Sequence, residues 1–468
     1  MEQHGDLALV ARLPEDVLTD VLRRLAATPR WLDISRSVCK AWRAIIDGES
    51  LLCTRLPFTG IFISMAVLPF PELFSRPSAP GRPAVSGKLH FLAAAVKVLP
   101  DGGCDRRGNH CIKGHCNGLL LLNDYVVNPA TQRWDRLPER PPNNAKGMVR
   151  HSCCNEYLSF DHTVSSHYQV FRLPYLLQLH WGSNNKYDPI EEASEWPPSR
   201  YTLHVFSSRT RRWEQRLFVR QGDAVGTVAE TREFSRRLLS VYWRGSLYVH
   251  CQNNFVVRLS LSEDKYNIIK LPMDTGREPY LGLSQKGVYL ASFVNDHLRV
   301  CVMDESNGHA QWILKHDYDL NPVKAFNRQV NGPWILEDIN YHFVLSRLPK
   351  VNKQAVIRYR QKKKVVVQDK FEWNSDDDDF DEHEDIVEAH QHKYFDMEIL
   401  GFHPYKEIIF LSRAESLKVN ATGFAYHLNS FKLESLGSIY PTDYAKFDVI
   451  GLPNESCYID SFPYTPMY

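Results

Sequence analysis

The sequence predicts an α+β protein with more than one domain, in which a small helical module precedes a larger all-β domain. Apolar residues between Leu13 and Ile46 recur at helical spacing, whereas that period disappears from about Leu56 onward. Short runs of β-branched, aromatic and leucine residues replace it, separated by Gly, Pro, Asn and Asp, as is typical of strands and turns. A chain of 468 residues is also too long for one ordinary core, and its 43% hydrophobic content indicates a folded protein.

The first helix is expected to begin at Pro14, because proline suits the first helical position, where its missing N–H is no loss. The acidic pair at 15–16 and the arginine pair at 23–24 place charge at the two helix ends with the signs that favour the helix dipole. Spacings of one, three and four residues then define one apolar face, formed by Val17, Leu18, Val21, Leu22 and Leu25.

A second helical run follows the break at Pro29 and a short turn through Trp31. Ser35 or Ser37 can cap it, and Gly48 is placed to end it. We predict three short helices for this module as a whole. Helices of this size bury little apolar surface alone, so their apolar faces need either the β domain or a partner protein. The residues expected on the apolar face of the second run are Val38, Trp42 and either Ile45 or Ile46.

The β part repeats a unit of strands and turns. The units at Gly245 and Gly287 are 42 residues apart, and Gly118 precedes Gly245 by 127 residues, about three such periods. A period of roughly 40 to 50 residues with four strands is typical of β-propeller blades, which stack because one sheet cannot cover both of its faces. We therefore predict a propeller of about six to eight blades, with the tail around Tyr458 returning to close the ring. A pair of β-sandwiches or an irregular β domain is the alternative.

Charge and composition narrow the classes of partner. A net charge of +1 removes the simplest argument for nucleic-acid binding, which depends on neutralising phosphates. Ten cysteines in a chain of this length are not a disulfide framework, and residues 1–10 show no signal peptide. The apolar stretches at 61–70 and 91–96 are too short to span a bilayer. We expect no nucleic acid, no membrane, and a location in the cytoplasm, the nucleus or both.

One segment, near residues 350–393, departs from the repeat. A basic run that includes Lys362-Lys363-Lys364 precedes an acidic run that starts at Asp376. Blocks of like charge are usually solvated and mobile, so we expect a long hairpin with a disordered tip at about 374–392. The alternatives are a docking tract for a charged partner and a weak nuclear-import signal.

No residue pattern predicts catalysis, and we expect no enzyme activity, no cofactor and no metal. The segment ending at Gly87-Lys88 has the wrong spacing for a P-loop, and His383-Glu384 lacks the i, i+4 histidine of zinc proteases. A group of Cys and His residues raises a zinc site as an alternative. It is a minor alternative, because the group lacks the paired Cys-x₂-Cys spacing of zinc sites. That group comprises Cys104, His110, Cys111, His115, Cys116, His151, Cys153 and Cys154.

The order of residues in the helical module is distinctive: Leu13-Pro14, two Val-Leu pairs with a trailing Leu25, then Val38-Cys39-Lys40-Ala41-Trp42. Over about residues 11–52 this order resembles an F-box, although Leu25-Ala26 stands where that family often has Leu-Pro. F-boxes bind the Skp-type adaptor of SCF-type cullin–RING ubiquitin ligases. The resemblance therefore implies an F-box at 8–55 that binds this adaptor and, through it, the cullin. The implied adaptor-binding residues are Leu13, Pro14, Val17, Leu18, Val21, Leu22, Leu25, Val38, Cys39, Trp42 and Ile46.

The β part carries a second resemblance. Cys116-Asn117-Gly118 before a run of leucines, the Val-Asn-Pro-Ala-Thr-Gln-Arg-Trp segment at 127–134, and the strand and turn at 201–213 are similar to the F-box-associated domain of large plant F-box families. This kelch-like propeller would cover 58–468. The resemblance implies a non-catalytic substrate receptor that recruits a protein for ubiquitination. The alternatives are a propeller enzyme or carbohydrate-binding protein with a helical cap, and an F-box scaffold outside ubiquitination.

Overall fold

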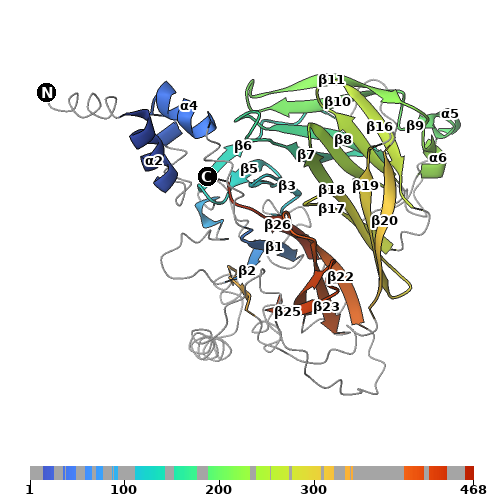
Figure 1. Cartoon of the computed structure of the whole chain (residues 1–468). Helices are drawn as coiled ribbons and strands as arrows, with labels where there is room; N and C mark the ends of the chain where they lie inside the picture. Colours follow the sequence, from blue (N-terminus) through green and yellow to red (C-terminus); the bar gives the residue numbers. More distant parts are fainter. Residues whose placement is uncertain are drawn as a thin grey trace, which may run out of the picture.

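Among its described residues the protein consists mainly of strands, with helices near its N-terminus (Figure 1). The structure is a computed structural model, and it describes residues 14–25, 35–36, 38–48, 58–65, 70–76, 87, 89–92, 111–142, 152–176, 188–231, 239–252, 255–272, 277–306, 310–320, 333–337, 339–340, 395–415, 421–439 and 459–467. The charged segment at 350–393, with its predicted hairpin, lies outside the described residues.

Helices α2 (Glu15–Leu25) and α4 (Lys40–Gly48) form the N-terminal module and lie outside the sheets in Figure 1. The amide of Leu18 donates to the carbonyl of Pro14 (3.0 Å), so Pro14 directly precedes the helix and α2 begins at Glu15, one residue after the predicted start. Helix α4 begins at Lys40, beyond both serines considered as caps, and ends at Gly48 as predicted. The β domain contains three short helical turns: η2 (His90–Leu92), α5 (Pro189–Glu192) and α6 (Val228–Thr231).

Within the described residues the strands form four sheets of four strands, one of eight and one of two. In spatial order the first two four-stranded sheets are β21 (Ile335–Leu336), β2 (Glu72–Ser75), β1 (Gly60–Met65), β26 (Ile459–Tyr464), and β3 (Gly114–Cys116), β4 (Leu119–Leu121), β5 (Tyr125–Asn128), β6 (Arg133–Arg136). The other two are β17 (Arg277–Ser284), β18 (Gly287–Val294), β19 (His297–Asp304), β20 (Gln311–Asp319), and β22 (Phe395–Phe402), β23 (Ile408–Glu415), β24 (Ala421–His427), β25 (Leu433–Ser438).

The eight-stranded sheet consists of two four-stranded antiparallel units. Its order is β13 (Ser240–Trp243), β14 (Ser246–Cys251), β15 (Phe255–Ser260), β16 (Lys265–Lys270), β11 (Arg212–Gln221), β10 (Arg200–Ser207), β8 (Gln169–Leu176) and β7 (Ser152–Ser159). The two units join through β11 and β16, which run parallel with Val219 opposite Lys265. The two-stranded sheet pairs β9 (Glu195–Trp196) with β12 (Gly226–Thr227).

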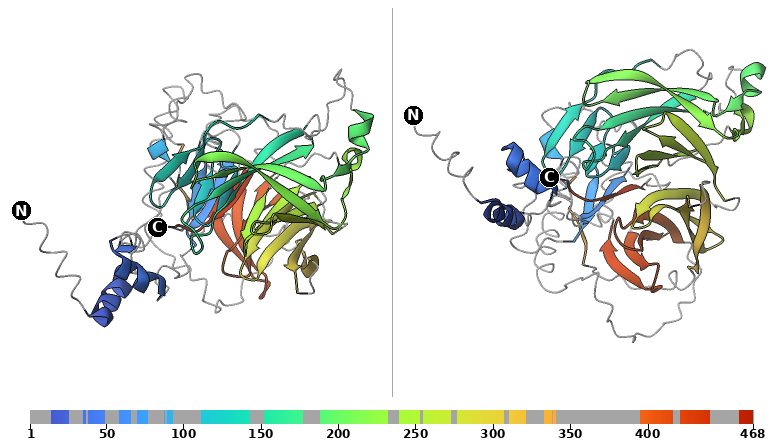
Figure 2. Two further views of the ribbon diagram at one scale, coloured as in Figure 1. Left: turned by 90° about the horizontal axis from the view of Figure 1, so that it is seen from above. Right: turned by 45° about the horizontal axis from the view of Figure 1, so that its top comes forward.

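The four-stranded units follow one another in a closed order. One strand of each unit contacts the corresponding strand of the next, in the sequence β26, β3, β7, β13, β17, β22 and back to β26. Figure 2 shows the sheets arranged around this common centre. The tail behaves as predicted, because β26 pairs antiparallel with β1 from Gly60 opposite Tyr464 to Met65 opposite Ile459. The prediction of a helical module followed by a β-rich domain is therefore confirmed.

Apolar clusters fill the space between neighbouring units. Leu121 and Val126 of one sheet pack with Leu158 and Val170 of the next, and the indole of Trp213 packs against the same cluster. Such contacts hold the units together, because each cluster takes side chains from two sheets. Trp134, unlike Trp213, has an exposed side chain. It lies on β6, the edge strand of its sheet, and is 41% exposed.

Candidate functional site

The N-terminal module has a small apolar core between its two helices. Leu18 and Leu22 of α2 are 6% and 0% exposed, and they pack against Ile45 and Ile46 of α4. Trp42 packs against this group from α4. Residues four apart lie on the same side of a helix, so Leu18 and Leu22 face α4 together. This core holds the two helices in a fixed relation.

Three valines of the same module remain exposed. Val17 and Val21 of α2 are 43% and 42% exposed, and Val38, just before α4, is 48% exposed. Pro14 and Cys39 are also exposed. Val17 and Val21 lie one turn apart on the same side of α2 and form an exposed apolar strip, which is a candidate interaction site. We refer to Val17, Val21 and Val38 as the valine face.

The structure thus divides the predicted adaptor-binding residues into two sets. Leu18, Leu22 and Ile46 are buried in the module's own core, with Trp42 partly buried against them, whereas the valine face, Pro14 and Cys39 are exposed. Leu13 lies outside the described residues, and the side chain of Leu25 is not among those described. The sequence pattern alone does not separate these sets, because Val17–Leu18 and Val21–Leu22 are adjacent pairs on one broad face.

Charge adds little to the stability of this module. Arg24 and Asp20 form an ion pair at 3.0 Å, one turn apart on α2, with both side chains largely exposed. Exposed pairs of this kind contribute roughly 0.3–0.5 kcal/mol. The module is therefore held mainly by its apolar core.

Residues 10–54 match the F-box domain family. The chain contains an F-box domain. The resemblance drawn from residues 13–42 is therefore confirmed for the helical module, and F-box domains typically bind Skp-type adaptors. The similarity of the β domain to F-box-associated domains stays a prediction, because the family match ends at residue 54.

Other comparisons add no identity beyond the F-box. No curated protein matches the chain. One similar solved structure comes from work described as "Structural and Mechanistic Analysis of Two Prolyl Endopeptidases: Role of Inter-Domain Dynamics in Catalysis and Specificity", with 9% identity and a TM-score of 0.23. The alignment covers 87% of this chain and 56% of that chain, so this chain spans little more than half of its length. A likeness this weak supports no argument.

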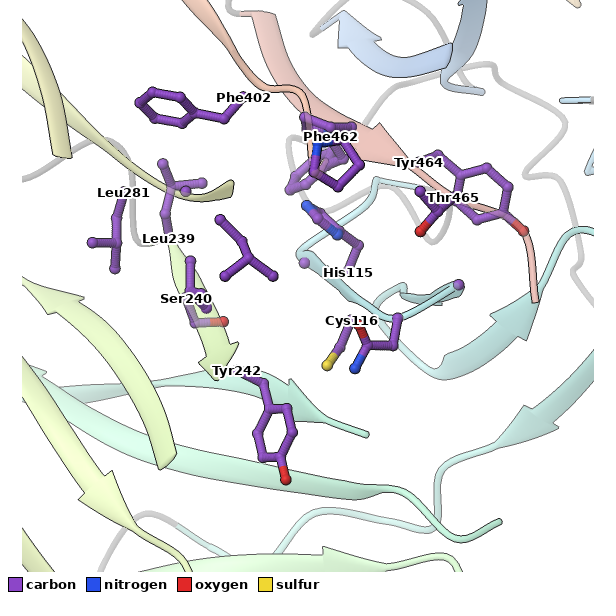
Figure 3. Close-up of a pocket in the computed structure, with 18 of the residues that line it drawn as sticks. His115, Cys116, Leu239, Ser240, Tyr242, Leu281, Phe402, Phe462, Tyr464 and Thr465 are labelled. Atoms are coloured by element: carbon purple, nitrogen blue, oxygen red, sulfur yellow. The ribbon is translucent and has the colours of Figure 1, made fainter. Parts of the chain in front are cut away.

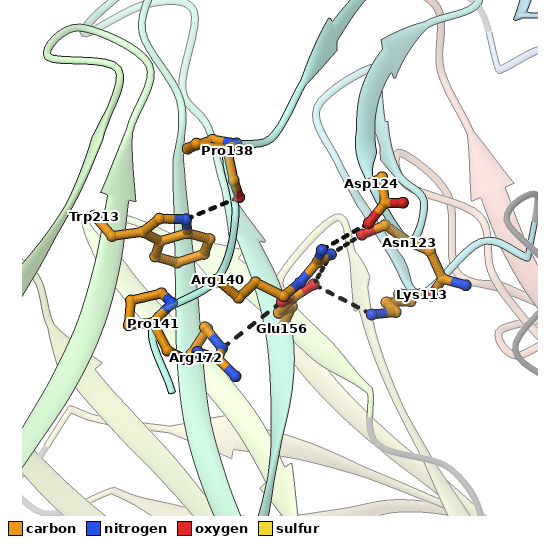
Figure 4. A network of polar contacts seen from close by, with 9 residues as sticks. All are labelled: Lys113, Asn123, Asp124, Pro138, Arg140, Pro141, Glu156, Arg172 and Trp213. Carbon is orange, nitrogen blue, oxygen red and sulfur yellow. Dashed lines mark hydrogen bonds and ion pairs between the residues drawn. The ribbon is translucent and has the colours of Figure 1, made fainter. Parts of the chain in front are cut away.

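Beyond the F-box, a buried carboxylate joins two neighbouring sheets (Figure 4). Glu156 of β7 is 4% exposed, and the guanidinium of Arg140 donates two hydrogen bonds to it, one at 2.9 Å. The Lys113 ammonium lies 3.2 Å from this carboxylate, and the Arg172 guanidinium lies 3.8 Å from it. Arg140 also binds Asp124 at 2.6 Å. The network therefore connects the β3–β6 sheet to β7 and β8.

The network keeps the carboxylate of Glu156 ionised. Burial acts to raise the pKa of Glu156, but the hydrogen bond from Arg140 and the charge of Lys113 lower that pKa below its usual value. The carboxylate is therefore ionised at neutral pH. Arg172 also donates to the carbonyl of Pro141 (2.5 Å). Sequence reasoning missed this junction, because its members lie on separate strands and loops and form no local motif.

The cysteine and histidine group considered for zinc is only partly described. Within the part of the chain that the structure describes, no three Cys, His, Asp or Glu side chains form a metal-binding group. The Cys116 thiol donates to the carbonyl of Phe160 (3.2 Å) and accepts from its amide (3.3 Å), and burial raises its pKa to about 12. Cys104, His110 and His151 lie outside the described residues.

Among the described helices, none is long and apolar enough to cross a bilayer.

Proposed function

We propose that this protein is the substrate-receptor subunit of an SCF-type cullin–RING ubiquitin ligase. The observation that carries the proposal is the F-box match at residues 10–54, on a module that leaves the valine face exposed. In this role the valine face packs against the Skp-type adaptor, which in turn joins the chain to the cullin. Each valine is already about half-buried, so covering it contributes about 1 kcal/mol.

The β domain is proposed to be a six-bladed, kelch-like propeller of the F-box-associated type that recruits a protein substrate. The closed order of four-stranded units and the pairing of β1 with β26 support this architecture. A ring whose first and last strands share a sheet is a stiff platform, and its connecting loops can vary without disturbing it.

As a substrate receptor, the protein performs no bond chemistry itself. It acts by proximity, because it holds a substrate lysine near the conjugating enzyme and so raises the effective concentration of that lysine. The proposed location is the cytoplasm, the nucleus or both, where such ligases have access to soluble substrates.

Adaptor binding by the valine face can be tested with the double variant Val17→Asp/Val21→Asp. A carboxylate buried at this interface costs several kcal/mol, so we expect at least a tenfold loss of Skp-type adaptor in a quantitative pull-down of the full chain. The matched control is Val219→Asp, because Val219 of β11 is also 42% exposed but lies in the β domain. The control should retain the adaptor in full.

Undiminished adaptor binding by the double variant would contradict the proposed role of the valine face. The ligase role requires in addition that the wild-type chain co-purify the cullin. Retention of adaptor without cullin would instead indicate an F-box scaffold outside ubiquitination. Proximity labelling with and without proteasome inhibition would then identify proteins whose recovery depends on an intact F-box.

A further inference from the structure

A cavity of about 80 Å³ lies at the centre of the ring of sheets (Figure 3). Residues of β3, β13, β17, β22 and β26, together with their adjoining loops, line it. Most of the wall is apolar, and it includes Leu239, Leu281, Phe402 and Phe462. No Asp or Glu is among the described residues that line the cavity. The one cation in the lining, Lys113, is already paired with Glu156.

His115 of β3 is the polar group that stands out in this wall. Its imidazole meets the ring of Phe462 edge to face, with centroids 5.8 Å apart, and Figure 3 shows it directed into the space between Leu239 and Phe462. Burial lowers the pKa of His115 to about 4, so the ring is neutral at pH 7. A neutral imidazole has one N–H donor and one nitrogen acceptor. Within the described residues, neither ring nitrogen has a hydrogen-bond partner.

The size of the cavity limits what it can hold. Drug-sized ligands occupy pockets of about 300–1,000 Å³, and an engineered apolar cavity of about 150 Å³ is large enough for benzene. A cavity of about 80 Å³ is too small to enclose such a ring completely, but it is partly open, so one small ring or branched alkyl group can enter it with part of the group outside. Charge imposes a second limit, because a charged group would lose its hydration without finding an opposite charge in the described wall.

We propose that this cavity binds one neutral, ring-sized apolar group whose single hydrogen-bonding atom pairs with His115. A phenol ring meets both conditions, since its hydroxyl can donate to the imidazole nitrogen while its ring packs against Phe402 and Phe462. This chemistry is available from a free small molecule or from a tyrosine side chain of a recruited protein. The second source rests on the proposed function, whereas the cavity itself does not.

Gly114 provides a way to fill the cavity without disturbing the fold. Gly114 lines the cavity, and a Cβ placed there meets no heavy atom within 4 Å. Leucine at this position therefore extends into open space. Thr202→Leu is the matched control, because Thr202 lies exposed on β10, away from the cavity.

The experiment measures binding of phenol, toluene and benzoate to the full chain co-purified with its adaptor, by saturation-transfer NMR. We expect phenol to bind more tightly than toluene, and benzoate not to bind. Gly114→Leu should weaken phenol binding at least tenfold, whereas Thr202→Leu should leave it unchanged. His115→Phe should remove the preference for phenol over toluene while toluene still binds, which keeps the test valid if Gly114→Leu does not fold.

The proposal would be overturned if neither phenol nor toluene showed saturation transfer, or if Gly114→Leu bound phenol as tightly as the wild type. Either result would indicate a cavity that holds only water. Equal binding of benzoate and phenol would overturn its selection for a neutral group. Displacement of phenol by N-acetyl-tyrosinamide supports a protein side chain as the source, and phenol binding without displacement supports a free small molecule. Adaptor pull-down of the same variants tests the proposed function separately. None of the substitutions alters the valine face, so adaptor binding does not depend on whether phenol binds.

Discussion

Gly60 in the first strand of the β domain lies directly opposite Tyr464 in the last, so β1 and β26 are neighbours in one sheet. Next to this pair, the rings of Phe62 and Tyr464 meet edge to face with centroids 5.2 Å apart. The two ends of the domain thus close the ring through both backbone pairing and side-chain packing. Closure of this kind makes the stability of every unit depend on the contact between the termini.

Phe62→Ala should destabilise the β domain by about 3–5 kcal/mol, because Phe62 is fully buried and its loss leaves a cavity at the closing sheet. Urea unfolding followed by tryptophan fluorescence measures the change. Phe431→Ala is the control, since Phe431 is 57% exposed and should change stability by less than about 0.5 kcal/mol. Equal losses of stability in Phe62→Ala and Phe431→Ala would contradict the importance of packing between β1 and β26 for the stability of the domain.

Within the F-box, substitution of the neighbouring residues Leu22 and Val21 should affect different properties, namely the stability of α2 and the binding of the adaptor. Leu22→Ala should cost about 2–5 kcal/mol and raise hydrogen exchange throughout α2, because Leu22 is completely buried against α4. Val21→Ala removes an exposed side chain, so α2 should stay protected while adaptor binding weakens. Hydrogen exchange by mass spectrometry, paired with the adaptor pull-down, separates the two effects. Loss of α2 protection in Val21→Ala would contradict the assignment of Val21 to the surface.

Substitution of Arg140 should lower the free energy of unfolding, because the buried charge of Glu156 then loses its main hydrogen-bond donor. Arg140→Met breaks the hydrogen bonds to Glu156 and Asp124, and we expect a loss of about 2–3 kcal/mol because Lys113 and Arg172 still neutralise the carboxylate. Adding Glu156→Gln to that variant should recover part of the loss, as chemical denaturation can measure. A double variant less stable than Arg140→Met would mean that the charge on Glu156 is stabilising even without Arg140.

Stability should fall as the pH drops below about 6.5. Burial lowers the pKa of His115 to about 4 and that of His403 to about 3, and the charges of Lys406 and His427 add to the shift of His403. An unfolded chain takes up these protons near pH 6.5, so between pH 6.5 and 4 it binds more protons than the folded chain, and stability rises with pH in this window. Each histidine contributes up to about 1.4 kcal/mol per pH unit.

Urea unfolding at pH 7.0, 6.0 and 5.0 measures this slope. The variant with both His115→Phe and His403→Phe should show a flatter pH dependence than the wild type, because it lacks the two histidines whose pKa values the fold lowers to about 4 and about 3. An unchanged slope in this variant would assign the effect to other groups. Glu156 adds to the slope only near pH 5, where an unfolded chain begins to protonate this carboxylate while its lowered pKa keeps it ionised in the folded protein. The double variant leaves that part of the slope unchanged.

Local patterns predicted the individual elements well. Helix α2 begins at Glu15, within one residue of the predicted start at Pro14, and the units read from Gly245 and Gly287 correspond to β14 and β18. These features follow from spacing and turn chemistry within a few residues, which a single sequence carries. The same patterns predicted six to eight blades, but they do not show how β11 pairs with β16 or that β21 joins β2.

The amino-acid order alone was enough to identify the F-box and a β-rich domain, because helix periodicity, turn residues and the Leu-Pro and Val-Cys-Lys-x-Trp elements are local properties of the chain. Tertiary packing decided which face of α2 is free, since Val21 and Leu22 are equally apolar and differ only in whether α4 covers them. It also brought His115 beside Phe462 and Glu156 beside Arg140. Such contacts arise when distant strands meet around one axis, and no short segment of sequence encodes them.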